Sequence, residues 1–222
     1  MAKETDTRDR VRVVGIGGSL SPASSSLAAL KIAIEGAEQA GAVTQVFDIR
    51  SLDLPMYNPS AKDVPASVRR MADAVYEADG LLWSSPLYHG TISGSFKNAL
   101  DWLQVLSDRT PPFLTDKVVG LLSAAGGTQG LQAVNTMEFV VRALRGWAVP
   151  LVIPIAEAWR VFDNEGFSKD PKLTELLHTL GAEVARAARQ FSRRTTTTPE
   201  AAKAEAELQP ISREEVVASE KE

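Results

Sequence analysis

A serine-rich loop near the start of the chain is the segment whose residue types and spacing most clearly predict chemistry. It begins at Gly18, and five of the next eight residues are serines: Ser19, Ser21, Ser24, Ser25 and Ser26. The apolar spacing that follows predicts a helix, and the free N–H groups and dipole of a helix N-terminus favour an anion. Serine hydroxyls add neutral donors. The loop therefore predicts a binding site for a monophosphate, which needs donors rather than a metal-bridging lysine.

Two better-known phosphate-binding patterns do not match this loop. Gly15 and Gly17 begin a dinucleotide fingerprint, but Leu20 stands where its third glycine belongs. Asp48, at the end of the second predicted strand, lies farther on than the roughly 20 residues expected for a ribose contact. No Gly-Lys-Ser/Thr follows, so the triphosphate loop is also excluded. The simpler alternative, serines that only cap the helix and shape a turn, would explain one or two of them.

A second segment combines a stiff turn with an aromatic ring. It consists of Pro86, Leu87, Tyr88, His89 and Gly90. Proline and glycine let the backbone approach a flat ligand closely, Tyr88 offers a ring for stacking, and His89 offers a hydrogen-bonding edge. The alternative interpretation is that Tyr88 only packs within the loop and that His89 is an ordinary surface histidine.

A third segment, residues 123–128, runs from Ser123 through Gly126 and Gly127 and again allows close backbone approach. Its alternative is a flexible turn between a strand and a helix. Elsewhere, polar residues of the third helix are expected to cap and solvate it: Lys97, Asn98 and Asp101. The tryptophans are expected in the core or at an interface: Trp83, Trp102, Trp147 and Trp159.

Alternating apolar runs and helical patterns predict the elements that hold these segments. Strands are predicted at residues 11–17, 43–49, 80–84, 118–122 and 149–155. The helices lie between and after them, and residues 51–65 form a loop. This alternation predicts an α/β three-layer sandwich with a five-stranded parallel sheet of order 2-1-3-4-5 and helices on both faces. Pro150 and Pro154 make the last strand an edge strand.

Helical spacing also predicts which side chains face the core. They are Leu27, Leu30, Ile34, Ala37, Val68, Met71, Val75, Ala78, Phe96, Leu100, Leu103, Val134, Met137, Val141, Leu144, Leu173, Leu176, Leu180 and Val184. In such a sheet ligands bind beyond the carboxyl ends of the strands, where strand order reverses. The serine loop and residues 84–90 flank that point, and residues 123–128 lie beside it.

The composition excludes several kinds of partner, site and location for this chain. The chain has 222 residues, a net charge of -4 and no cysteine, so we expect no nucleic-acid partner, no disulfide and no thiolate chemistry. His89 and His178 are the two histidines, and we predict no metal site. No apolar run reaches the length of a membrane span, and residues 1–10 do not resemble a signal peptide, so we expect a cytoplasmic protein without membrane contact.

The domain boundaries follow from the same patterns. Residues 1–10 are predicted to be a flexible N-terminus and residues 11–192 one domain. Residues 193–222 contain no aromatic side chain and a run of four threonines, which predicts a disordered tail. A short helix over residues 200–208 is the alternative.

The combination of segments resembles the NADPH-dependent FMN reductase family of flavodoxin-like proteins. Three segments carry the likeness, from residue 11 to about residue 155. They are Gly18-Ser19 with Ser24, Pro86-x-Tyr88 with Gly94-x-x-Lys97-Asn98-x-x-Asp101-Trp102, and Gly126-Gly127. The chain departs from the pattern at Ser21, where many members carry arginine. A charge-assisted hydrogen bond is stronger than a neutral one, so this departure implies weaker phosphate binding.

The resemblance implies a flavodoxin-like FMN-binding domain. Ser19, Ser24 and Ser26 would hold the FMN phosphate, with Ser21 and Ser25 in the same loop. Residues 86–90 would line the isoalloxazine ring, and residues 123–127 would lie near its pyrimidine edge or the ribityl chain. Hydride would pass from NADPH or NADH to flavin N5, and two electrons would then reach an acceptor. No side chain is assigned a catalytic role.

The resemblance further implies a homodimer or homotetramer and a small acceptor such as free flavin, a quinone, an azo compound or a metal oxyanion. Two other functions compete with this reductase. The first is a flavodoxin-type electron carrier, which tends to be more acidic than this chain. The second is a nucleotide-binding regulatory module without chemistry. Neither the acceptor nor the choice between NADPH and NADH can be read from the residues.

Overall fold

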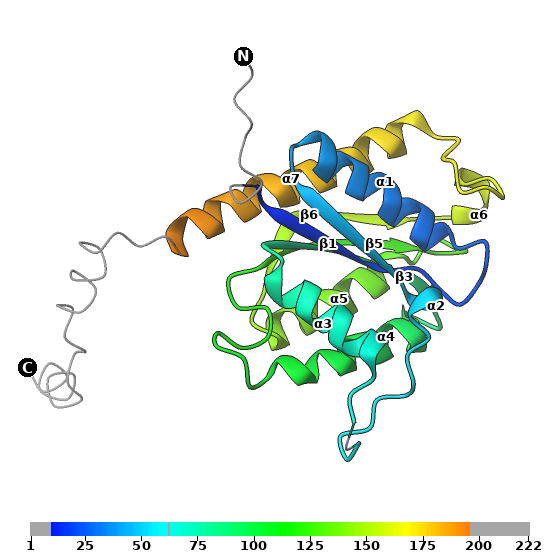
Figure 1. Cartoon of the computed structure of the whole chain (residues 1–222). Coiled ribbons are helices and arrows are strands. Elements are labelled where there is room, and N and C mark those ends of the chain that lie inside the picture. Colours follow the sequence, from blue (N-terminus) through cyan, green and yellow to red (C-terminus); the bar gives the residue numbers. More distant parts are fainter. Residues whose placement is uncertain (1–9, 62, 196–222) are drawn as a thin grey trace, which may run out of the picture. The chain divides into compact units, whose positions relative to one another are not determined.

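The computed structural model describes residues 10–61 and 63–195 (Figure 1). Its strands are β1 (Arg12–Gly17), β2 (Val43–Asp48), β3 (Gly80–Tyr88), β4 (Thr91–Ile92), β5 (Val118–Ala124) and β6 (Trp147–Ile155). The longer helices are α1 (Ser25–Gln39), α3 (Ala66–Glu77), α4 (Gly94–Asp101), α5 (Leu131–Ala143) and α7 (Pro171–Thr195). Short helices are α2 (Ile49–Leu52), α6 (Ala158–Val161) and the 3-10 turn η2 (Trp102–Leu106).

The sheet confirms the predicted topology. Five parallel strands follow the order β2-β1-β3-β5-β6, and β4 adds a short antiparallel pair to β3. β6 lies at the edge, as its prolines predict, and its register against β5 shifts between Val119 and Leu121. Pro150 lies within that irregularity, where a missing N–H costs the ladder little.

Helices cover both faces of the sheet and divide the core in two. On one face α1 and α7 pack over Val13, Leu82 and Leu122. On the other, α3, α4 and α5 pack over Ile16, Leu81 and Leu121 (Figure 1). The opposite orientation of successive side chains along buried strands accounts for the division.

Some predicted strand ends and one predicted core position were wrong. β3 continues to Tyr88, so residues 85–88 are strand rather than loop. Strand pairing with both β5 and β4 satisfies the backbone there. In α7 Leu177 is fully buried, whereas Leu176 is 40% exposed. The adjacent leucines differ by about 100° around the helix, so a one-residue error moves the side chain off the core face.

Two glycines allow α1 and α7 to pack closely. A Cβ on Gly181 would overlap the carbonyl oxygen of Ala33, and a Cβ on Gly36 would overlap the backbone of His178. The two helices therefore touch backbone to backbone at this crossing. α7 runs to Thr195, beyond the predicted domain end. The predicted flexible N-terminus (Arg10 apart) and the tail from residue 196 onward lie outside the described residues.

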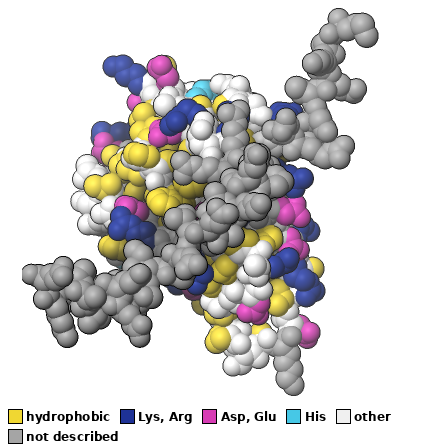
Figure 2. All heavy atoms as spheres, turned by 90° about the vertical axis from the view of Figure 1, so that its left-hand side faces the viewer, with side chains coloured by type: hydrophobic (Ala, Val, Ile, Leu, Met, Phe, Trp, Pro, Cys, Tyr) yellow, Lys and Arg dark blue, Asp and Glu magenta, His cyan; other side chains and the backbone are white. Residues whose placement is uncertain are grey.

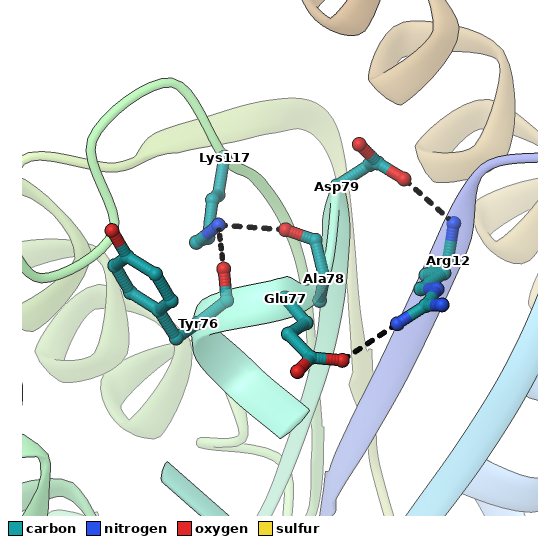
Figure 3. A network of polar contacts seen from close by, with 6 residues as sticks. All are labelled: Arg12, Tyr76, Glu77, Ala78, Asp79 and Lys117. Carbon is teal, nitrogen blue, oxygen red and sulfur yellow. Dashed lines mark hydrogen bonds and ion pairs between the residues drawn. The ribbon is translucent and has the colours of Figure 1, made fainter. Parts of the chain in front are cut away.

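A polar network joins β1, α3 and β5 at the amino ends of the strands (Figure 3). Lys117 Nζ donates to the carbonyl oxygens of Tyr76 and Ala78, both at 2.7 Å, and so caps the end of α3. Burial lowers the pKa of Lys117, and the nearby carboxylates of Asp79 and Asp116 oppose part of that effect. Asp79 also accepts the backbone N–H of Arg12 at 2.8 Å.

Charges of both signs are interspersed on the surface at this end of the sheet. In Figure 2, dark blue and magenta side chains alternate on the visible face, with apolar side chains between them. No strong field of one sign is present on the coloured part of that face. Across residues 10–61 and 63–195, no helix has both the length and the apolar character that a membrane span requires.

Candidate functional site

The three candidate segments meet at the carboxyl edge of the sheet. Gly17 at the end of β1 is in register with Ser84 of β3, and Pro86 is in register with Ala124 of β5. The segments that follow β1, β3 and β5 therefore leave the sheet side by side, on the side opposite the polar network (Figure 1). This is the place where strand order reverses.

The serine loop starts with two glycines because the chain passes very close to β3. A Cβ on Gly17 would lie 2.5 Å from the carbonyl oxygen of Ser84. Gly18 has φ +97°, a left-handed conformation that L side chains rarely adopt, and its N–H donates to the same oxygen at 3.3 Å. Ser84 Oγ in turn donates to the carbonyl oxygen of Ser26 at 2.7 Å. β3 thus fixes both ends of the loop.

The positions of the serines are compatible with both predicted roles, which are capping or turn formation and phosphate binding. Ser24 is the N-cap of α1, and its hydroxyl accepts the N–H of Leu27 at 3.2 Å. The Oγ atoms of Ser24 and Ser26 are 3.0 Å apart. Ser19 is buried, and its Oγ accepts the N–H of Ser21, whose side chain is exposed. Capping therefore explains Ser24, and a turn explains Ser19.

The loop offers backbone donors to an anion. Within the described residues, the N–H groups of Ser24, Ser25 and Ser26 donate to no protein acceptor. The first turn of α1 carries no acidic residue. Asp48 lies beside Gly18, but its carboxylate is engaged by the N–H of Arg50 at 3.1 Å and caps α2. Unpaired donors at a helix N-terminus, in a tight glycine cradle, suit a monophosphate.

A cleft of about 510 Å³ lies along the outer side of α1 next to this loop. Ser24 and Ser25 line one part of it, Lys31 contributes a cation, and residues 162–168 form the opposite wall. Glu35, Asp163 and Glu165 also line the cleft, so acidic side chains outnumber basic ones there.

The second segment forms the end of β3 and a tight hairpin to β4. His89 and Gly90 are its two turn residues, with φ of 50° and 84°. Two positive φ values in a two-residue loop are the hallmark of a type I′ turn. Pro86 is buried, Leu87 is half-buried, and Tyr88 is 50% exposed. The hairpin thus presents Tyr88 and His89 beyond the sheet.

Several residues that hold this hairpin, or the loop before α3, were missed by sequence reasoning. Ser85 Oγ accepts the N–H of Ser93 at 3.0 Å, and Ser93 caps α4 by accepting the N–H of Phe96. Asn98 was expected to solvate α4, but it is buried. Its Oδ1 accepts the N–H of Tyr57 at 2.8 Å, and its amide donates to Pro55. Bonds between residues so far apart in sequence leave no local pattern.

The third segment begins in β5 and ends in an exposed glycine pair. Ser123 is fully buried, and its hydroxyl donates to the carbonyl oxygen of Gly130 at 2.7 Å, so its side chain supports the start of α5. Gly126 and Gly127 are exposed. The residues after β6 donate hydrogen bonds to the carbonyl groups of this segment. The shortest of these bonds runs from the N–H of Ala158 to Ala125 O at 2.9 Å.

The tryptophans divide into two classes. Trp83 and Trp102 are buried in the core as expected, and Trp102 Nε1 donates to Pro55 O at 2.7 Å. Trp147 and Trp159 are 58% and 62% exposed, so they are not core residues. Trp159 Nε1 donates to the carbonyl oxygen of Gly126 at 3.3 Å.

Comparisons with a family model and with known proteins agree with one another. Residues 11–160 match the model of the family described as NADPH-dependent FMN reductase. An NAD(P)H-dependent FMN reductase of Pseudomonas aeruginosa is 32% identical over 176 residues, which cover 76% of this chain and 90% of that protein. The NADPH-dependent FMN reductase ArsH of Rhizobium meliloti is 29% identical over 160 residues, covering 72% of this chain. The chain spans 53% to 65% of the length of three ArsH relatives.

A solved structure supports the fold. The flavoenzyme FerB of Paracoccus denitrificans, an NAD(P)H:(acceptor) oxidoreductase, superposes with a TM-score of 0.65. The alignment covers 82% of this chain and 98% of FerB at 21% identity. At that identity the likeness establishes the flavodoxin-like arrangement of strands and helices.

Proposed function

The chain belongs to the family of NADPH-dependent FMN reductases, and we propose from this premise that it binds FMN and carries electrons from NADPH or NADH to a small acceptor. The observation that carries the proposal is the meeting of three segments at one edge of the sheet, with unpaired N–H groups in the first of them. When bound, FMN supplies two-electron chemistry between a nicotinamide and an acceptor.

In this proposal the serine loop holds the phosphate of FMN. The N–H groups of Ser24, Ser25 and Ser26 have no protein acceptor within the described residues, which is the requirement for binding an anion. The hydroxyls of Ser19, Ser24 and Ser26 lie on the same loop, and two of them already contact each other. Ser21 is exposed at the rim and brings no charge. The phosphate would therefore be held by neutral donors alone.

The ring of FMN would lie between the second and third segments. Residues 86–90 provide a rigid hairpin end, and Gly126 and Gly127 carry no side chain that would obstruct a flat ligand. Ser123 contributes through α5, since its hydroxyl already bonds Gly130. These residues orient the ring and shield it from water on the sheet side. No proton transfer by a side chain is required, so no residue is given a catalytic role.

The acceptor class follows from the same proposal. A flavin with one open face reduces free flavin, quinones, azo compounds or metal oxyanions, and we propose an acceptor of this group. We also propose a homodimer or homotetramer and a cytoplasmic location, as expected from the sequence.

Two measurements test this function. The purified full-length protein, mixed with FMN, should show a flavin absorbance band that survives gel filtration or equilibrium dialysis. Rapid mixing of this holoprotein with NADPH and with NADH, without oxygen, should bleach that band directly, and turnover with benzoquinone should follow. A bound flavin that neither nucleotide bleaches would identify an electron carrier instead. A protein that does not bind FMN would refute the proposal.

A further inference from the structure

Three consecutive residues after β6 bind three consecutive carbonyl oxygens of the third segment. The N–H of Ala158 donates to Ala125 O at 2.9 Å, and the N–H of Glu157 donates to Gly127 O at 3.0 Å. Between them, the indole N–H of Trp159 donates to Gly126 O at 3.3 Å. We call residues 157–159 the clamp. Trp159 is its one side-chain donor.

The clamp dictates where the N–H groups of the glycine loop point. In a planar trans peptide the N–H of one residue points opposite to the carbonyl of the residue before it. Fixing the oxygens of residues 125–127 against the clamp therefore turns the N–H groups of Gly126, Gly127 and Thr128 away from it. Those three groups donate to no acceptor in the described part of the chain.

The direction away from the clamp leads toward the candidate site. The clamp follows β6, and β5 lies between β6 and β3 in the sheet. The side of the glycine loop that faces away from β6 is the side of β3, where Tyr88 and His89 leave the sheet. The loop thus presents a row of unpaired donors to the space proposed for the flavin ring.

The glycine loop needs this external support. Gly126 and Gly127 are exposed, and a Cβ on Gly126 would meet no atom within 4 Å. The peptide between two exposed glycines rotates at little cost, so the backbone of these residues does not by itself fix the carbonyl of Gly126. Its recorded partner is the indole of Trp159.

The clamp itself is held in a rarely used conformation. Glu157 has φ 43° and ψ 46°, the left-handed region that non-glycine residues seldom occupy. Its carboxylate pairs with Arg160 at 3.0 Å, and the Arg160 guanidinium lies 4.7 Å from the centroid of the Trp159 ring. Such backbone strain concentrates at ligand sites. The ion pair and the stacked guanidinium keep the 62% exposed indole over the loop.

We propose that Trp159 is a positioning residue for FMN: by holding the Gly126 carbonyl, it aims the Gly127 N–H at the pyrimidine edge of the flavin. This inference rests on the proposed function. Two-electron-reduced FMN bears more negative charge at that edge than the oxidised form, so an N–H donor there favours the reduced form. Trp159 therefore sets the reduction potential as well as the affinity.

The test compares Trp159→Phe with Trp147→Phe in the full chain. Both remove one indole N–H from a mostly exposed tryptophan, but Trp147 contacts Phe191 and has no bond to the glycine loop. FMN affinity is measured by flavin fluorescence titration and the midpoint potential by dye equilibration. Trp159→Phe should weaken the binding of oxidised FMN about two- to tenfold. It should weaken the binding of reduced FMN about tenfold more than that, which lowers the two-electron reduction potential by about 30 mV.

The outcomes separate this inference from the proposed function. Trp147→Phe should match the wild type in both measurements. If Trp159→Phe also matches the wild type while both proteins bind FMN, the positioning role is refuted and the reductase proposal stands. If the wild type binds no FMN, the reductase proposal itself fails. A Trp159→Phe apoprotein that no longer unfolds cooperatively on heating would make Trp159 a structural residue and would equally overturn the inference.

Discussion

Replacing Ser24 by aspartate should weaken FMN binding at least a hundredfold while the fold remains. Ser24 caps α1 through its bond to the Leu27 N–H at 3.2 Å. Aspartate and asparagine are N-caps as good as serine, so Ser24→Asp and Ser24→Asn should each change the free energy of unfolding by less than about 0.5 kcal/mol. The two variants differ in one negative charge, and so they form a matched pair.

The size of the effect follows from the position of the cap. The Ser24 and Ser26 hydroxyls are 3.0 Å apart, so a carboxylate at position 24 would stand next to a phosphate on the adjacent N–H groups. At an effective dielectric of about 20, two unit charges about 4 Å apart repel by about 4 kcal/mol. Salt and solvent reduce this, and we expect at least a hundredfold loss of FMN affinity, about 2.7 kcal/mol.

The assay is a flavin fluorescence titration at low and at high salt, with thermal unfolding of each apoprotein as the control for folding. Ser24→Asn should stay within about fivefold of the wild type, whereas Ser24→Asp should lose binding, less so at high salt. Equal FMN affinities for the two variants, with both folded, would refute the placement of the phosphate at this loop.

Three further predictions concern the departure from the family pattern, the helix crossing and the buried lysine. Ser21→Arg should strengthen FMN binding about tenfold by adding a charge-assisted bond and should steepen its salt dependence; an unchanged titration would contradict this. Gly181→Ala should lower the free energy of unfolding by at least about 2 kcal/mol in urea because the methyl overlaps Ala33, whereas Gly94→Ala, which meets no atom within 4 Å, should not. The burial-lowered pKa of Lys117 means that the folded state binds fewer protons than the unfolded state between the two pKa values, so stability rises with pH there. The stability advantage of the wild type over Lys117→Gln should therefore grow as the pH rises toward the ordinary lysine pKa of about 10.4, and a constant or shrinking advantage would be the contrary result.

Sequence reasoning recovered the parts of the molecule that depend on local pattern. The alternation of apolar runs gave five parallel strands in the correct order, because each buried strand needs a continuous apolar run and each helix an apolar stripe. The same rule placed the serine loop at the point where strand order reverses. Pro150 and Pro154 identified the edge strand, since a missing N–H is tolerated there.

The features that the sequence did not predict depend on contacts between residues that are far apart in the chain. Nothing near Asn98 signals that its amide will hold the backbone of Tyr57, 41 positions earlier. The bond from Trp159 to Gly126 spans 33 positions and arises only because β5 and β6 are neighbours in the sheet. Such tertiary bonds explain why Asn98, expected on a helix surface, is buried, and why the indole N–H of Trp159 bonds the glycine loop.

The central claim is that the serine loop holds the phosphate of a flavin. The most direct measurement compares the dissociation constants of FMN and riboflavin for the wild-type protein, because the two ligands differ only in that phosphate. Hydrogen bonds to a charged group are each worth about 1.5–3 kcal/mol, so at least two of them predict that FMN binds roughly a hundredfold or more tightly than riboflavin. Equal dissociation constants for the two flavins would contradict the claim.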